Sequence, residues 1–105
     1  MGNPQLNGGY TRIAHEIIEA IVKSNLSGAQ IRATLWIIRL TYGFQRKEMI
    51  TNVGAFATKL KSTRGYVKQV FEELEHVHVI TVEWATPEVC KVIFNKDFDK
   101  WKCFL

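Results

Sequence analysis

Apolar residues recur every three or four positions between Thr11 and Ser24, while Glu16, Glu19 and Lys23 fall on the opposite side. This spacing predicts an amphipathic helix that is capped by Thr11 and has one buried face. The predicted buried stripe consists of Ile13, Ile17, Ile18 and Ile21.

A second helix has well-marked ends. Ser27 is followed three residues later by Gln30, the pattern of a capping box, and the helix is expected to end at Tyr42 with Gly43 in the left-handed position. Two apolar stripes run along it, Ile31, Leu35, Ile38 and Tyr42 on one side and Ala33, Trp36 and Leu40 nearly opposite. We expect the chain's C-terminal tail to cover the second stripe; the alternative is a homodimer interface.

Two shorter helical patterns follow the pair Met49–Ile50, which is a candidate short strand. Thr51 or Asn52 can cap a brief helix, and after a turn Ser62 or Thr63 can cap the next one. The apolar positions of the brief helix are Val53, Phe56 and Leu60, and those of the next are Val67, Val70, Phe71 and Leu74.

After His76 the period of the apolar pattern changes to that of extended chain. Two β-rich runs flank a turn at 85–88 and predict a β-hairpin, and the tail from Asn95 is a short helix or a packed extension. The predicted fold is mainly α with a small hairpin: a winged helix-turn-helix of three to four helices and a two-stranded wing. It forms a single domain over residues 10–105 after a flexible lead-in at 1–9.

Composition excludes several classes of protein. With 105 residues, 47% of them hydrophobic and 23% charged, the chain is expected to form one ordered domain. Its apolar runs are far shorter than the ~20 residues that cross a bilayer, so no membrane contact is expected. Two cysteines are too few for a disulfide scaffold, which favours a cytoplasmic location.

The net charge of +4 matters less than where the cations lie. Residues 59–71 hold four positive side chains and no negative one, and three glutamates follow within 72–75. The helix that begins near Thr63 therefore places a basic face at its N-terminal end, as a helix that enters the major groove of DNA would. A merely solvated helix face is the alternative.

Each residue type on this face has a use in DNA binding. Arg64 or Lys68 can donate to guanine, Gln69 can pair with adenine, and Gly65 permits close backbone approach. The hydroxyls and the remaining lysines suit phosphate contacts. The candidate DNA-binding residues are Lys59, Lys61, Ser62, Thr63, Arg64, Gly65, Tyr66, Lys68 and Gln69.

The predicted wing has the opposite character. Glu83 and Glu88 flank its turn, and no Lys or Arg lies between Thr81 and Cys90. Only Thr86 and Lys91 can assist in gripping phosphates. An acidic wing leaves open a second interpretation, in which the domain contacts another protein.

The sequence offers no catalytic constellation. His76, His78, Cys90 and Cys103 match no zinc-binding spacing, and no phosphate loop or nucleophile motif is present. We therefore expect no enzymatic activity, no metal and no cofactor.

Three stretches, Asn7–Ala20 (NGGYTRIAHEIIEA), Leu26–Gly28 (LSG) and Leu35–Phe44 (LWIIRLTYGF), resemble the N-terminal domain of the bacteriophage replication protein O family. The similarity is close over Asn3–Thr51 and looser to Trp101. One departure is Lys61–Ser62, where a Gly-Leu turn is usual in the family.

The resemblance implies a winged-helix domain that recognises repeated sites in a phage replication origin, in the cytoplasm of the bacterial host. It places Thr63–Val67 at the start of the recognition helix. The expected partners are double-stranded DNA, a second copy on repeated sites, and a helicase or its loader through a C-terminal region absent from this chain. A transcriptional regulator is the alternative within the DNA-binding class.

Overall fold

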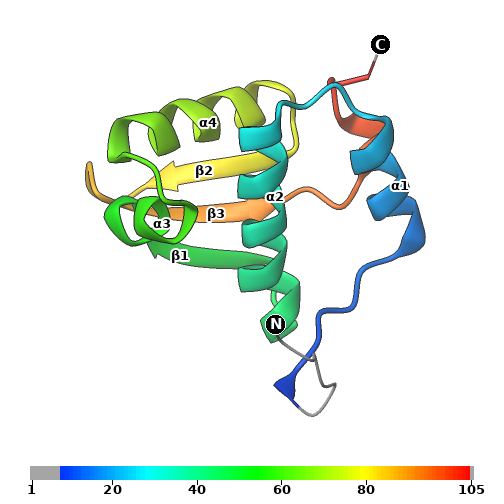
Figure 1. The fold of residues 1–105 in the computed structure, drawn as a ribbon, viewed down its shortest axis with the longest axis horizontal. Coiled ribbons are helices and arrows are strands. Elements are labelled where there is room, and N and C mark those ends of the chain that lie inside the picture. The colour runs from blue at the N-terminus through cyan, green and yellow to red at the C-terminus, as the bar shows by residue number, and fades with distance from the viewer. Residues whose placement is uncertain (1–7, 105) are drawn as a thin grey trace.

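The computed structural model describes residues 8–104 of the chain, a mixed α/β arrangement of helices packed on one antiparallel sheet (Figure 1). Its α-helices are α1 (His15–Lys23), α2 (Gly28–Thr41), α3 (Val53–Leu60) and α4 (Arg64–His76). Its strands are β1 (Glu48–Asn52), β2 (Ile80–Trp84) and β3 (Val89–Phe94), and its short 3-10 helices include η2 (Tyr42–Phe44) and η3 (Phe98–Lys100). Of the predicted lead-in at 1–9, residues 1–7 lie outside the described part, and Gly8 and Gly9 are exposed.

The sheet has three strands, where two were predicted for the wing; the candidate short strand at Met49–Ile50 forms and is β1. The hairpin of β2 and β3 forms as expected, and β1 pairs with the other side of β3, giving the order β1-β3-β2. Met49 of β1 lies opposite Val92 of β3, and both are buried. The pairing joins segments about forty residues apart, which no local turn signal connects.

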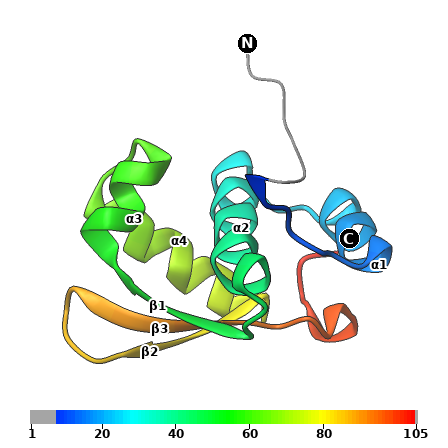
Figure 2. The same ribbon diagram turned by 90° about the horizontal axis from the view of Figure 1, so that it is seen from below.

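Helix α2 lies at the centre of the molecule, between α1 on one side and α3 with α4 on the other (Figure 2). Its buried residues are Ala33, Thr34, Ile37, Ile38 and Thr41. The two threonine hydroxyls donate to the carbonyls of the preceding turn, at 2.8 Å to Gln30 and to Ile37, so their burial leaves no polar atom unpaired. Leu35, predicted to lie on a buried stripe, is half exposed, at an open hollow that it shares with Trp36 and the α3 residues Lys59 and Leu60.

The C-terminal tail packs elsewhere than predicted. Trp101 is buried against Phe94, with ring centroids 5.8 Å apart, and the backbone amide of Asn25 donates to the carbonyl of Cys103 at 2.7 Å. Ala33 and Trp36 instead face α3, where Leu60 lies beside both. The tail therefore packs against the end of β3 and the segment that follows α1, and it does not cover the second stripe of α2.

Side-chain caps begin three of the four helices described. Ser27 and Gln30 form the predicted capping box of α2, Asn52 accepts from the amides of Gly54 and Ala55 at the start of α3, and Thr63 accepts from Tyr66 at the start of α4. The first helix differs: it starts at His15 and has no side-chain cap, so Thr11 does not begin it.

Helix ends follow a common pattern that the sequence did not predict. Chain reversal after α2 falls on Gln45, which has φ of 57°, and not on Gly43. Lys61 after α3 and His78 after α4 are also left-handed, with φ of 56° and 66°. In each case the next amide bonds a carbonyl five residues back, the Schellman arrangement.

None of the described helices is long and apolar enough to cross a membrane.

Candidate nucleic-acid interface

Helix α4 divides cleanly into a buried and an open face. Val67, Val70, Phe71 and Leu74 point into the core, as predicted, and Phe71 meets Phe56 of α3 edge to face at 4.9 Å between ring centroids. This contact packs α4 against α3. The first two turns of α4 then present the opposite face outward.

The predicted residues of this face are accessible. Arg64, Gly65, Tyr66 and Gln69 are exposed, and Lys68 is half-buried. Around Gly65 no atom lies within 4 Å of the position a Cβ would take. The backbone of the first turn of α4 is thus open to a close-approaching partner.

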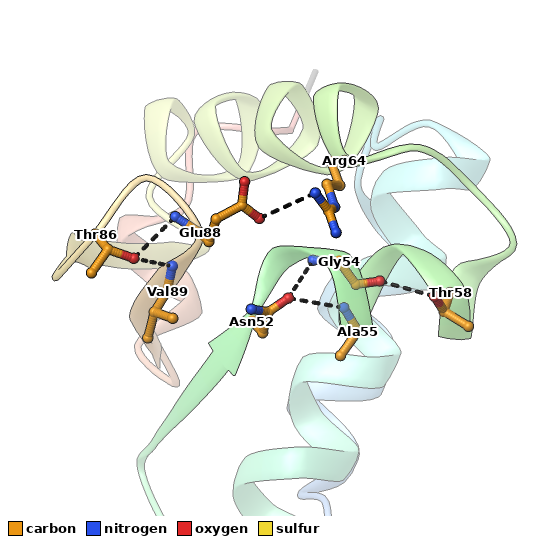
Figure 3. Close-up of polar contacts among 8 residues, drawn as sticks. All are labelled: Asn52, Gly54, Ala55, Thr58, Arg64, Thr86, Glu88 and Val89. Carbon is orange, nitrogen blue, oxygen red and sulfur yellow. Dashed lines mark hydrogen bonds and ion pairs between the residues drawn. The ribbon is translucent and has the colours of Figure 1, made fainter.

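Arg64 is held by two neighbours from distant parts of the sequence (Figure 3). Its guanidinium lies over Gly54 at the start of α3, where an added Cβ would come within 2.9 Å of Nε. Its Nη1 lies 3.8 Å from Oε2 of Glu88 in the β2–β3 turn. Both side chains remain largely exposed, so the pair contributes under about 1 kcal/mol and can be exchanged for another anion.

Backbone bonds bring the β2–β3 turn to this place. The amide of Val53 donates to the carbonyl of Glu88 at 2.8 Å, which ties the turn to the start of α3. Within the turn, Thr86 Oγ1 accepts from the amides of Glu88 and Val89 (Figure 3). The starts of α3 and α4 and the hairpin turn therefore converge on Arg64 and Glu88.

A second contact joins the hairpin to α4. Lys68 Nζ lies 5.6 Å from the centre of the Trp84 ring, a cation–π distance, and Trp84 is 44% exposed. The long side chain of Lys68 is thereby oriented along the edge of the open face.

Lys59 and Lys61 lie at the other end of α3. Lys59 Nζ sits 4.7 Å from the centre of the Trp36 ring, and Lys61 occupies the left-handed position that ends the helix. Arg32 of α2, which the sequence did not single out, reaches the same place and donates from Nη2 to the carbonyl of Leu60 at 2.8 Å. These three cations flank the α3–α4 turn, while Ser62 is half-buried within it.

Carboxylates outnumber cations on the hairpin, where Glu83 and Glu88 accompany a single lysine, Lys91. Lys91 Nζ lies 3.0 Å from Glu83 and 3.5 Å from Glu48, and its hydrogen bond to Glu83, reinforced by both negative charges, raises the pKa of Lys91. Lys91 is already engaged with carboxylates, and Thr86 is engaged within the turn. Neither of the two wing residues that the sequence offered for phosphate contact is free of intramolecular partners.

Sequence reasoning missed Arg32, Glu88 as the partner of Arg64, and Trp84. Glu88 and Trp84 were visible as hairpin residues, but only the β1–β3–β2 register places them against α4. Arg32 carried no signal beyond its charge.

Within residues 8–104, no three His, Cys, Asp or Glu side chains gather closely enough to hold a metal ion. Cys90 and Cys103 are both buried free thiols. Burial raises the pKa of Cys90 to about 11 and also raises that of Cys103, which keeps both thiols protonated at neutral pH.

Comparison with known proteins gives one match. Residues 3–101 match the family described as bacteriophage replication protein O. No curated protein and no solved structure matches the chain.

Proposed function

This chain belongs to the bacteriophage replication protein O family, and from that premise we propose that it is the origin-recognition domain of a replication initiator and binds double-stranded DNA through α4. The family implies a role with DNA and the replication machinery in general. The proposal adds the mode of binding and the residues that carry it.

We interpret the domain as a winged helix-turn-helix. In this interpretation α3, the left-handed turn at Lys61 and α4 form the helix-turn-helix, with α4 as the recognition helix and the β2–β3 hairpin as the wing. Strand β1, which precedes α3, completes the sheet against β3 and anchors the wing to the start of α3.

One observation supports DNA binding above the rest: the basic N-terminal half of α4 is open, while its apolar face is buried. Arg64 and Gln69 can reach base edges, and the exposed Tyr66 and Thr63 lie beside the helix N-terminus, whose partial positive charge favours phosphates. Lys59, Lys61 and Arg32 extend the positive surface along the adjacent backbone of a duplex.

The domain acts by binding alone, without a cofactor or a chemical step, and two copies occupy repeated or palindromic sites. Contact with a helicase or its loader is assigned to a part of the initiator other than the described residues.

The test begins with selection of binding sites from random duplex DNA, followed by affinity measurements on the selected site and on random duplex. Arg64→Ala and Gln69→Ala should each cost about 1 to 3 kcal/mol on the selected site and relax base choice. Lys59→Ala and Lys61→Ala should weaken both duplexes alike, since phosphates carry no sequence information. Lys102→Ala, an exposed lysine of the tail, is the charge-matched control.

Equal losses on both duplexes for all four variants would reject the assignment of base-reading residues. Binding of selected DNA should also fall steeply with salt, by about 0.9 in log affinity per log salt for each phosphate contacted.

The acidic hairpin, whose single lysine is paired with two glutamates, supports a second candidate, a winged helix that contacts a protein. The pairing of Glu88 with Arg64 and of Lys91 with two glutamates leaves the hairpin without a free cation for phosphates among its described residues. This candidate gains if selection returns no motif and DNA binding shows no salt dependence. A transcriptional regulator would bind DNA in the same way, and the location of the selected site, inside or outside an origin, separates that role from replication.

A further inference from the structure

A second concentration of positive charge lies at the C-terminal end of α2, the end away from α4 (Figure 1). Arg39, Arg46, Lys47 and, from the segment before α1, Arg12 are all exposed there. Residues 8–15 and 39–47 contain no Asp or Glu. Among residues 8–104 none of these four cations forms an ion pair, in contrast to Arg64, which faces Glu88.

Exposed aromatic rings are interleaved with these cations. Phe44 is 54% exposed and Tyr10 is 61% exposed. The guanidinium carbon of Arg39 lies 5.1 Å from the centre of the Phe44 ring, and that of Arg46 lies 6.0 Å from it. Two guanidinium groups thus lie near one ring that remains about half exposed, which combines planar surface and positive charge in one place.

The backbone holds this group in a fixed arrangement. Gln45 is left-handed, and the amide of Arg46 donates to the carbonyl of Thr41 at 2.8 Å, so Phe44 and Arg46 project from a closed turn. Arg39 packs so closely on Gly43 that a Cβ there would come within 2.6 Å of its guanidinium. Ordering of these side chains therefore costs less when a ligand arrives.

The surface beside the aromatic rings is hollowed on both sides of Gly43. One hollow, of about 300 Å³, is bordered by Tyr10, Arg39 and Phe44. The other, of about 410 Å³, is bordered by Tyr10, Arg12 and Gln45. Hollows of this size accommodate planar organic groups.

We propose that this surface, formed by Tyr10, Arg12, Arg39, Phe44 and Arg46, is a second nucleic-acid site and binds single-stranded DNA. Phosphates would contact the arginines while unpaired bases stack on Phe44 and Tyr10. The bases of an intact duplex are stacked on one another and do not offer a free face, so exposed rings between cations favour a single strand over a second duplex. The proposal rests on the role of a replication initiator, since opening a duplex at an origin produces unpaired strands.

The test uses the full 105-residue chain and a labelled oligothymidine of about 15 nucleotides, near the upper end of single-strand site sizes. Phe44→Leu keeps an apolar side chain but removes the ring, and should weaken binding by about 5- to 100-fold. The double variant Arg12→Gln with Arg46→Gln should lower the slope of log affinity against log salt by about 1.4, because each phosphate contact on a single strand contributes about 0.7 to that slope. Lys96→Gln with Lys102→Gln removes the same charge from the tail and should change neither value.

Duplex binding is measured in parallel on the site selected for α4. Phe44→Leu should leave it unchanged, and Gln69→Ala should weaken duplex binding while leaving oligothymidine binding intact. That pair of results identifies two separate sites.

Three results would overturn the proposal. Absence of oligothymidine binding by a chain that still binds its duplex would remove the second site and leave the proposed function standing. Equal weakening of duplex binding by Phe44→Leu would make the surface a part of the duplex interface. Equal competition by polyglutamate at the same concentration of charge would make it a general anion-binding surface.

Discussion

The left-handed residues after α2, α3 and α4 are the least expected feature at the scale of single residues. Gln45, Lys61 and His78 each carry a Cβ in a conformation that costs an L-residue about 1 to 2 kcal/mol relative to the right-handed one. The Schellman hydrogen bonds around them hold the conformation in place. Glycine would adopt it without that cost.

We predict that His78→Gly raises the free energy of unfolding by about 0.5 to 1 kcal/mol. The His78 side chain is exposed, and the hydrogen bonds of this residue are made by its backbone: the amide donates to the carbonyl of Glu75 at 3.0 Å and the carbonyl accepts from Asn95 at 2.9 Å, so little contact is lost. Urea unfolding followed by circular dichroism measures the change. His76→Gly is the matched control, since His76 ends α4 in helical geometry and the same substitution should destabilise it. A loss of stability in both variants would show that the His78 side chain matters.

Local bonds explain which residue-scale features could be predicted. The caps at Ser27, Asn52 and Thr63 join a side chain to a backbone amide two or three residues away, so spacing alone reveals them. The left-handed positions could not be found in this way, because Gly43 lies two residues from the true reversal at Gln45. The ion pair of Arg64 with Glu88 was invisible for a different reason: 24 positions separate the partners, and only the folded sheet joins them.

At the scale of elements, the sequence predicted α4 itself well, but it did not predict which elements surround the exposed face of α4. The helical spacing of its apolar residues and its N-terminal cap predicted where α4 begins and which residues it buries. The residues of its exposed face follow from that helical spacing. The surroundings of the face depend on the pairing of β1 with β3, which brings the hairpin turn to the start of α3. Long-range pairing leaves no periodic trace in either segment.

We predict opposite effects of Gly65→Ala on stability and on DNA binding. An added methyl group meets open space in the free protein, and alanine favours a helix over glycine by about 0.5 to 1 kcal/mol, so thermal unfolding should shift upward. If the first turn of α4 approaches a duplex closely, the methyl group will collide with it and duplex affinity will fall. Calorimetry and fluorescence anisotropy measure the two effects.

Gly28→Ala is the control for that experiment. Gly28 also lies in the first turn of a helix with open space around its Cβ position, but at the start of α2. It should raise stability without changing duplex affinity. Unchanged affinity in Gly65→Ala would place the backbone of α4 away from the groove.

At the scale of the whole molecule, the second apolar stripe of α2 no longer supports a dimer. Ala33 is fully buried against α3 and α4, and Trp36 is half-buried under Lys59. Leu35 is the exposed large apolar side chain of α2, and single exposed apolar side chains are normal on monomers.

We predict that the domain sediments as a monomer at micromolar concentration without DNA, and that two copies assemble only on a duplex with repeated sites. Leu35→Ser should leave sedimentation unchanged in both conditions. A free dimer that Leu35→Ser dissociates would instead restore the α2 surface as an interface between copies.

The place of Trp84 beside Lys68 has a practical consequence. Of the three tryptophans, Trp101 is buried and Trp36 is shielded by Lys59, whereas Trp84 stands at the rim of the open face of α4. The fluorescence emission of Trp84 should therefore report binding of a ligand to that face. Quenching or a spectral shift on titration would follow occupancy of α4 with no label attached, while the second basic surface, at the far end of α2, would leave this signal silent.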